Sequence, residues 1–240
     1  ADHSSVGDLL KALNPDDLKK YYAVRFADGK MADLFAPVDA DAEVTPVTFA
    51  DEDGRKVYRH SCSHLLAIAV KNLYPEAKLA IGPAIENGFY YDFDLPAPFS
   101  PEDLPKIEKE MDRVARKALR PRRYTLPRAE AIALMEQRGE PYKVQLIMDL
   151  PEDETLSFYE MGDFVDLCVG PHLPSLSYLK AFKLTQIAGA YWRGDEHNKM
   201  LCRVYGTCFP TKDELEEYLR QIEEAKKRDH RKLGRELELF

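Results

Sequence analysis

The chain has 240 residues, of which 45% are apolar and 10% aromatic, so it is long enough to bury a sizeable core in one or two domains. Its formal net charge of −8 argues against a globally basic nucleic-acid binder, although a local basic surface is still compatible with it. No apolar run approaches the roughly eighteen residues that span a bilayer, and the first residues do not read as a basic and apolar leader. The cysteines are too few for a disulfide framework. We therefore expect a protein of the reducing cytoplasm that does not bind a membrane.

The first fifty residues predict a small α+β unit. Residues 4–20 predict a short helix that breaks before its end, and residues 22–35 predict a hairpin around Asp28-Gly29, because Asp-Gly supplies the positive φ angles of a two-residue turn. Residues 44–49 predict a further strand, placed at a sheet edge because Pro46 has no amide hydrogen.

Two histidines open the next element. The charged segment Asp51–Gly54 predicts a turn and a domain boundary. The apolar run that follows His60 predicts a helix of about four turns that ends at Tyr74-Pro75. His60 and His64 are spaced i, i+4 and therefore share one face of this helix.

Residues 78–84 and 89–95 predict a pair of strands around Glu86-Asn87-Gly88. In the second strand apolar and polar residues alternate, so one face is expected to be buried. Tyr91 lies on the apolar face, and a plain core position is an alternative to a functional one.

A basic run follows the next helix, which is predicted to start at Ser100-Pro101 with acidic residues in its first turn. Between residues 113 and 128 there are seven basic residues and no acidic one. These are Arg113, Arg116, Lys117, Arg120, Arg122, Arg123 and Arg128. The run is either a solvated helix face or a surface that neutralises RNA phosphates.

The remainder predicts a mixture of helices and strands. A helix is expected over residues 127–138, ending at Gly139, and a capping box at Thr211–Glu214 starts a last, polar helix that ends near residues 238–240. Four segments are expected to be extended: 141–147, 155–159, 182–187 and 200–205. Because helices and strands do not alternate regularly, we predict an α+β fold with an antiparallel sheet.

The segment Cys168–His172 carries a cysteine and a histidine four residues apart around Gly170-Pro171. Together with His60 and His64 it provides four side chains that can each donate a lone pair. Imidazole and thiolate are ligands that suit zinc, and imidazole also serves as a general base. The spacing alone leaves metal binding and catalysis open.

In order along the chain, these motifs resemble the amino-terminal half of threonyl-tRNA synthetases. The resemblance is carried by His60–Leu66, Ala80–Pro83, Asn87–Asp92, Asp166–His172, Ala188–Asp195 and Lys226–Gly234. It implies a ubiquitin-like domain over residues 1–52 whose first hairpin would precede Ala1, and an editing domain over residues 53–210. It also implies a linker helix over residues 211–240 that leads to an aminoacylation domain outside this chain.

The resemblance implies an editing hydrolase that removes serine from mischarged seryl-tRNA(Thr). Serine lacks one methyl group of threonine, and a synthetic site rejects the smaller substrate by only about 1–3 kcal/mol, so a second site is needed. The implied partner is the 3′ end of tRNA(Thr). The full-length enzyme is expected to be a homodimer and this part of it a monomer. Editing is expected to need no cofactor, whereas ATP and zinc would serve the aminoacylation domain.

The resemblance also assigns site residues. Catalysis is assigned to His60, His64, Lys143, Cys168 and His172, and substrate binding to Gly82, Tyr91 and Asp166. His60 would hold or deprotonate a water, directly or through the ribose hydroxyl of the terminal adenosine. Lys143 would stabilise negative charge or place a second water, and Asp166 would bind the substrate's ammonium or hydroxyl group. Cys168 and His172 would shape the pocket and fix water. Gly82 and Tyr91 would line the amino-acid end of the pocket.

Four alternatives stay open on the sequence. Zinc bound by His60, His64, Cys168 and His172 is possible but not favoured, and Cys168 could act as a nucleophile. The chain could be a non-catalytic tRNA-binding module that has a structural zinc site and docks RNA on the basic run. It could also be a free-standing editing factor that acts in trans.

Overall fold

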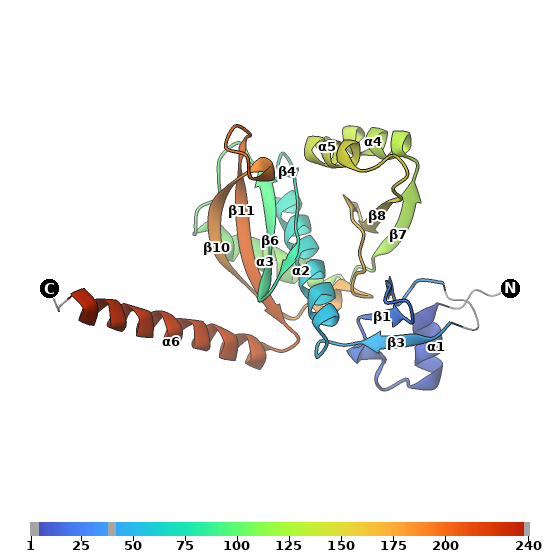
Figure 1. The fold of residues 1–240 in the computed structure, drawn as a ribbon, viewed down its shortest axis with the longest axis horizontal. Coiled ribbons are helices and arrows are strands. Elements are labelled where there is room, and N and C mark those ends of the chain that lie inside the picture. The colour runs from blue at the N-terminus through green and yellow to red at the C-terminus, as the bar shows by residue number, and fades with distance from the viewer. Residues whose placement is uncertain (1–4, 38–41, 238–240) are drawn as a thin grey trace.

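The computed structural model describes residues 5–37 and 42–237, with side chains up to residue 228. Within these ranges, helices and strands are mixed and every pairing between named strands is antiparallel, which confirms the predicted α+β class. Three sheets form separate parts of the molecule, and one long helix extends away from them (Figure 1). Short 3-10 helices cover Leu18–Lys20, Leu176–Tyr178 and Trp192–Gly194.

The amino-terminal unit has one helix and a three-stranded sheet of order β2-β1-β3. Its elements are α1 (Val6–Leu13), β1 (Ala23–Phe26), β2 (Met31–Asp33) and β3 (Val44–Val47). The predicted hairpin is confirmed, and Gly29 in its turn has φ of +85°. β3 is an edge strand, as Pro46 predicted.

Helix α2 (Glu52–Leu73) starts eight residues earlier than predicted, so the turn expected at residues 51–54 is wrong. Asp51 is the residue before the helix, and its carboxylate accepts a hydrogen bond from the Thr48 backbone N–H. Glu52 and Asp53 then occupy the first turn, where acidic side chains are stabilised by the helix dipole. The boundary expected between residues 52 and 53 therefore lies inside the first turn of α2.

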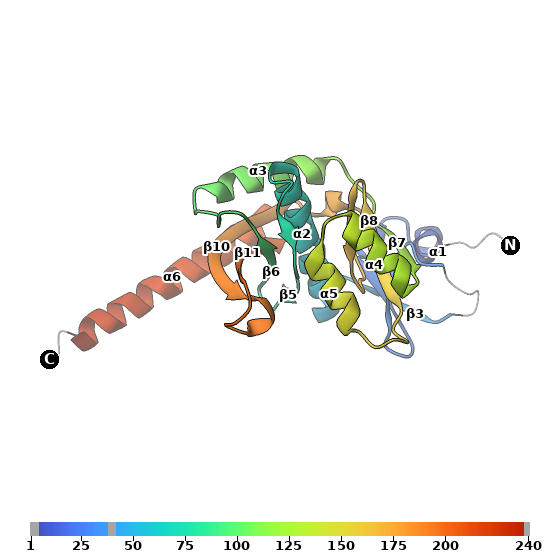
Figure 2. The same ribbon diagram turned by 90° about the horizontal axis from the view of Figure 1, so that it is seen from above.

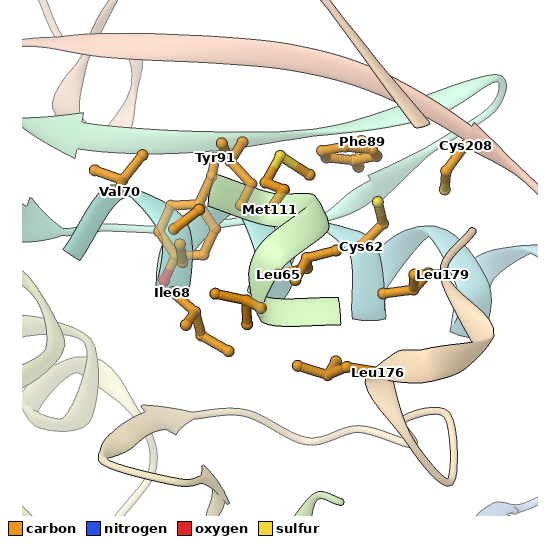
Figure 3. Packing of buried hydrophobic residues seen from close by; sticks show 14 of the residues in the cluster. Cys62, Leu65, Ile68, Val70, Phe89, Tyr91, Met111, Leu176, Leu179 and Cys208 are labelled. Carbon is orange, nitrogen blue, oxygen red and sulfur yellow. The ribbon is translucent and has the colours of Figure 1, made fainter. Parts of the chain in front are cut away.

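The central sheet has the order β10-β11-β6-β4, with β5 paired to β6. Its strands are β4 (Lys78–Leu79), β5 (Ala84–Ile85), β6 (Gly88–Asp94), β10 (Ala181–Tyr191) and β11 (Met200–Phe209). Helices α2 and α3 (Asp103–Arg116) pack on it, as Figure 2 shows from above. Figure 3 shows the core between them, where Leu65, Phe89 and Met111 are fully buried.

The start of α3 lies three residues beyond the predicted Ser100-Pro101. Asp103 accepts hydrogen bonds from both the backbone N–H and the hydroxyl of Ser100, so the capping residues are engaged although the helix begins later. Ile107 and Val114 of this helix are buried.

A third sheet, of order β7-β8-β9, carries two helices. Its elements are β7 (Arg122–Leu126), β8 (Leu156–Met161), β9 (Phe164–Leu167), α4 (Arg128–Gln137) and α5 (Pro141–Asp149). Residues 141–147 were expected to be extended, and this is wrong because they form most of α5. Pro141 in the first turn was the overlooked helix signal, while Val144 and Ile147 favoured a strand.

Helix α6 (Lys212–Leu237) follows the predicted capping box, in which the Glu214 carboxylate accepts from the Thr211 backbone and hydroxyl. It points away from the sheets (Figure 1), and among its described side chains only Leu215 is buried. The predicted end at residues 238–240 lies outside the described residues. None of the helices that the structure describes has the length and apolar character to cross a membrane.

Candidate functional site

Two segments far apart in sequence meet at one cluster of histidine and cysteine side chains. Helix α2 contributes His60 and His64, and the loop after β9 contributes Cys168 and His172. One potential ligand atom from each of the four lies within 4.8 Å of the others. His60 Nε2 lies 2.9 Å from Cys168 Sγ, which in turn lies 3.4 Å from His172 Nε2. The two pairs of residues singled out by the sequence thus form one site.

The partners of the outer ring nitrogens fix how the histidines are oriented. His60 Nδ1 lies 3.2 Å from the Gly82 carbonyl oxygen, which can only accept, so Nδ1 carries the hydrogen and Nε2 carries a lone pair. His172 Nδ1 lies 3.0 Å from the Ser61 hydroxyl, which also accepts from the Leu173 backbone N–H. Each ring therefore turns its other nitrogen toward the centre of the cluster.

Burial keeps the cluster uncharged. It lowers the pKa of His60, and it lowers the pKa of His64 and His172 well below the ordinary value, with the neighbouring imidazoles adding to the effect. Burial and the nearby Asp166 carboxylate raise the pKa of the Cys168 thiol. At neutral pH the imidazoles are bases and Cys168 is a thiol, which argues against Cys168 as a nucleophile.

Beside the cluster lies a buried ion pair. Lys143 Nζ is 2.5 Å from Asp166 Oδ1, and the Tyr91 hydroxyl donates to Asp166 Oδ2 over 2.8 Å. Lys143, Asp166 and Tyr91 are at most 3% exposed. His64 Nε2 lies 3.6 Å from Asp166 Oδ2, which is too long for a hydrogen bond. The ion pair and its tyrosine donor therefore form one network that touches the histidine cluster.

A cavity of about 1360 Å³ opens over this site between α2, α5, the β8 and β9 strands and residues 81–87. Six of the assigned residues line it: His60, His64, Gly82, Lys143, Asp166 and Cys168. His172 and Tyr91 are fully buried and are not among its lining residues. Tyr91 was expected to line the amino-acid end, but it instead lies behind Gly82, where a Cβ atom would come within 2.0 Å of the tyrosine ring.

The basic run lies away from this cavity. None of the six residues assigned to tRNA binding is among the residues that line it: Arg113, Arg116, Lys117, Arg120, Arg122 and Arg123. Three of them pair with carboxylates, Arg113 with Glu110, Arg116 with Asp112 and Arg122 with Glu160. Arg128, the last of the run, donates to the Leu150 carbonyl. The structure therefore gives most of this charge a local partner.

Sequence reasoning missed several polar residues that hold the site. Ser63 donates to the Gly82 carbonyl, and Ser61 contacts His172; both are buried on a helix, and their place between the two histidines was the available signal. Asp33 and Tyr159 hold the Cys168–His172 loop from two other strands. Nothing in the sequence pointed to either, because their contacts depend on how the sheets are arranged.

The donor set fits a zinc ion. Ligating histidines usually hold one ring nitrogen on an outer partner and turn the other to the metal, as His60 and His172 do here. His64 Nδ1 is buried and has no hydrogen-bond partner among the described residues. Zinc is bound tetrahedrally by imidazole nitrogen and thiolate sulfur, and this cluster offers four such ligands. These four residues are therefore the ones that could hold a metal.

A family profile and several known proteins match this chain. The family profile of the threonyl and alanyl tRNA synthetase second additional domain matches residues 156–205. The chain is 63% identical over 213 residues to the threonine–tRNA ligase of Acetivibrio thermocellus, covering 89% of this chain and 34% of that protein. It is 58% identical over 235 residues to that of Clostridium tetani, covering 98% and 37%, and 55% identical over 236 residues to that of Clostridioides difficile, with the same coverage.

The chain spans about a third of the length of these curated relatives. The match of residues 156–205 includes β8, β9 and the Cys168–His172 loop. The chain is therefore homologous to one part of the threonyl-tRNA synthetases, the part that contains the second additional domain common to the threonyl and alanyl enzymes.

Proposed function

We propose that this chain is an editing hydrolase that cleaves the ester bond of seryl-tRNA(Thr) and spares threonyl-tRNA(Thr). The observation that carries the proposal is the neutral His60 facing Cys168 beside the buried Lys143–Asp166 pair, all on the wall of one large cavity. Hydrolysis of an ester requires a placed water, a proton acceptor and a cation or donor for the developing oxyanion. His60 would accept the proton, Lys143 would stabilise the oxyanion, and Cys168 beside His60 would help to place the water.

His60 is the proposed base. Its Nδ1 hydrogen is held by the Gly82 carbonyl, so the lone pair on Nε2 is directed at the Cys168 thiol, whose S–H can donate to it. A water would take the place of this thiol hydrogen bond when His60 acts as the base. Its pKa lies below the ordinary value because it is buried, so the imidazole is unprotonated and ready to accept at neutral pH. It would take the proton from a water, directly or through the ribose hydroxyl of the terminal adenosine.

Lys143 and Asp166 are proposed to bind the two ends of the reacting group. The Lys143 ammonium is fixed by Asp166, and its Nζ lies 5.6 Å from the centroid of the Tyr91 ring. Because the ammonium is already held in place, little rearrangement of the site is needed during the reaction. It would stabilise negative charge on the ester oxygen. Asp166 has further lone pairs beyond those used by Lys143 and Tyr91, and would bind the substrate's ammonium or hydroxyl group.

Selection of serine is proposed to rest on the crowded wall formed by Gly82 over Tyr91. Gly82 is in direct contact with the Tyr91 ring, since an added Cβ atom would come within 2.0 Å of it, so the backbone at Gly82 is backed by the ring and cannot move away from the cavity. A rigid wall of this kind excludes a methyl group by overlap, which a pocket that binds the larger amino acid cannot do to the smaller one. The threonine methyl would meet such a wall.

The proposed reaction needs no metal. A zinc ion bound by His60, His64, Cys168 and His172 would have four protein ligands, which is the closed geometry of structural sites. A zinc ion lowers the pKa of a bound water only when one coordination position is left open for that water. Here four protein side chains would fill all four positions. Zinc on all four side chains would thus remove the proposed base from its task.

The proposed partner is the 3′ end of tRNA(Thr), within a threonine–tRNA ligase of the cytoplasm that acts as a homodimer. ATP and a zinc ion would belong to the aminoacylation part of such an enzyme. The relatives named above support this context, since their names are those of threonine–tRNA ligases.

The test is release of amino acid from seryl-tRNA(Thr) and threonyl-tRNA(Thr), measured side by side with excess protein. The proposal expects rapid loss of serine and slow loss of threonine, with a ratio set mainly by the wall at Gly82. Tight binding of both RNAs with no release above the uncatalysed rate would instead favour a non-catalytic RNA-binding module.

A further inference from the structure

The loop that carries Cys168 and His172 is fastened from the amino-terminal sheet. Asp33, the last residue of β2, accepts a hydrogen bond from the His172 backbone N–H over 2.7 Å, although 139 residues separate them in the chain. Its other carboxylate oxygen accepts from the Tyr159 hydroxyl over 2.8 Å. Asp33 is only 3% exposed, so both oxygens act inside the protein.

Tyr159 makes the same loop fit closely. Its ring centroid lies 4.5 Å from that of His172 at an angle of 66°. A Cβ atom at Gly170 would come within 1.9 Å of the Tyr159 hydroxyl oxygen, so the tyrosine packs directly against the loop backbone. Asp33 binds both the tyrosine hydroxyl and the His172 backbone. These two hydrogen bonds fix the position of the loop relative to β8 and β2.

We propose that Asp33 is a positioning residue of the editing site, which sets Cys168 and His172 against His60 by holding the loop between them. This rests on the proposed function. Among the described residues no basic side chain lies within ion-pair distance of Asp33, so its direct side-chain contacts are the two hydrogen bonds, and the more distant Arg123 charge only adds to them. Removing the carboxylate leaves a buried N–H and a buried hydroxyl without an acceptor.

The proposal makes the amino-terminal unit part of the site rather than an independent neighbour. Met31, on the same short strand as Asp33, lines the cavity that His60 and Cys168 also line. In a reaction that depends on the alignment of catalytic groups, a displacement of the loop by about 1 Å is enough to lower the rate on the order of 100-fold. A purely structural role would change stability and leave the geometry of the folded site intact.

Three variants separate these roles: Asp33→Ala, Asp33→Asn, and Asp28→Ala as a control from the exposed hairpin turn of the same sheet. The asparagine keeps an acceptor for the His172 N–H, and its amide can donate to the tyrosine oxygen. Two quantities are measured on the folded protein: kcat and KM for serine release, and the rate at which Cys168 reacts with a thiol reagent. The second reports on the loop because Cys62, Cys202 and Cys208 are buried whereas Cys168 is half-buried.

We expect Asp33→Ala to lower kcat by roughly 10- to 100-fold with KM little changed, and to raise the rate of Cys168 labelling by about tenfold or more. Asp33→Asn should restore both values to near those of the parent chain, and Asp28→Ala should match the parent. Labelling and kcat unchanged in folded Asp33→Ala would overturn the proposal, as would an asparagine variant that is as impaired as the alanine one.

Two results would need a second measurement: an Asp33→Ala variant that does not fold, and a parent chain that releases no serine. If Asp33→Ala does not fold, Tyr159→Phe decides, because it removes one of the two hydrogen bonds and keeps the ring. It should raise Cys168 labelling by a smaller factor, and no rise would count against the proposal. If the parent chain releases no serine, the proposed hydrolysis fails, whereas the labelling rates still decide whether Asp33 holds the loop.

Discussion

His60 Nε2 and Cys168 Sγ lie 2.9 Å apart, although 108 residues separate them in the chain. The contact joins the helix of the central sheet to the loop that follows β9, and it closes the cluster from which the function is argued. The buried Lys143–Asp166 pair stands beside it and makes the site both polar and nearly sealed from solvent on its inner side.

Breaking the buried ion pair should cost stability as well as activity. Lys143→Ala leaves the Asp166 carboxylate with only the Tyr91 hydroxyl as a donor, so the free energy of unfolding should fall by about 3–5 kcal/mol. Lys183→Ala, which removes a partly exposed pair with Glu108, should cost less than about 1 kcal/mol. Urea unfolding followed by circular dichroism measures both.

The double variant Lys143→Met with Asp166→Leu separates stability from chemistry. Replacing both partners of a buried pair by apolar groups removes the unpaired charge, so most of the lost stability should return while serine release stays absent. Serine release at the parent rate in this double variant would show that the pair has no part in the reaction.

Stability should fall as the pH is lowered through the range in which free histidine titrates. The pKa values of His60, His64 and His172 lie below the ordinary value in the folded protein because the rings are buried, so the unfolded chain binds more protons below about pH 6.5. Each fully shifted imidazole lowers the free energy of unfolding by about 1.4 kcal/mol per pH unit in that range. Asp33, whose pKa is raised by burial, acts in the opposite direction at lower pH.

Urea unfolding at several pH values between about 5 and 7 measures this slope. The variant His64→Asn should reduce the slope of the free energy of unfolding against pH by roughly the contribution of one imidazole, since the pKa of His64 lies well below the ordinary value. Equal slopes in the two proteins would contradict the claim that His64 is held neutral by burial.

An added methyl group at residue 82 should disturb the network without touching a charged residue. In Gly82→Ala the new Cβ atom meets the Tyr91 ring at 2.0 Å, so the ring must move and its hydroxyl must leave Asp166. We expect a loss of about 1–3 kcal/mol in stability and a strong fall in serine release. Tyr91→Phe, which loses only the hydrogen bond, should cost about 1 kcal/mol.

Comparison of the two variants shows whether the wall or the hydrogen bond matters more. If Gly82→Ala keeps the parent stability, then Tyr91 does not form the rigid wall on which the proposed selection of serine depends. The ratio of serine to threonine release should fall further in Gly82→Ala than in Tyr91→Phe.

Zinc should inhibit serine release rather than support it. The four potential ligands lie within 4.8 Å of one another, and an ion that binds all of them takes up the lone pair of His60. Treatment with a chelator should leave the rate unchanged, and added zinc should lower it in proportion to the zinc bound. A chelated protein that loses activity and regains it with one zinc per chain would overturn the metal-free account.

The sequence predicted which side chains lie together better than it predicted the elements around them. The i, i+4 spacing of His60 and His64 placed both on one helix face, and the Cys168–His172 spacing marked their partner loop, because local geometry alone fixes such pairs. It could not predict that α5 is helical, since the short segment Pro141–Asp149 mixes helix and strand signals. The position of Lys143 therefore rested on resemblance.

Contacts between sheets were beyond sequence reasoning. Asp33 and Tyr159 meet His172 only because the amino-terminal sheet packs behind the loop, and no periodicity in their own strands reports that arrangement. Tyr91 is a second example. The alternation of apolar and polar residues placed it correctly on the buried face of β6, but it did not show that Gly82 would pack against it.

The most direct test of the central claim is the single-turnover rate of serine release from seryl-tRNA(Thr) by the parent chain and by His60→Ala. His197→Ala serves as the matched control, because the His197 side chain is 84% exposed and contacts Asp195 rather than the cluster. The account predicts that His60→Ala loses on the order of 100-fold or more while His197→Ala keeps the parent rate. Equal rates in the parent chain and His60→Ala would contradict it.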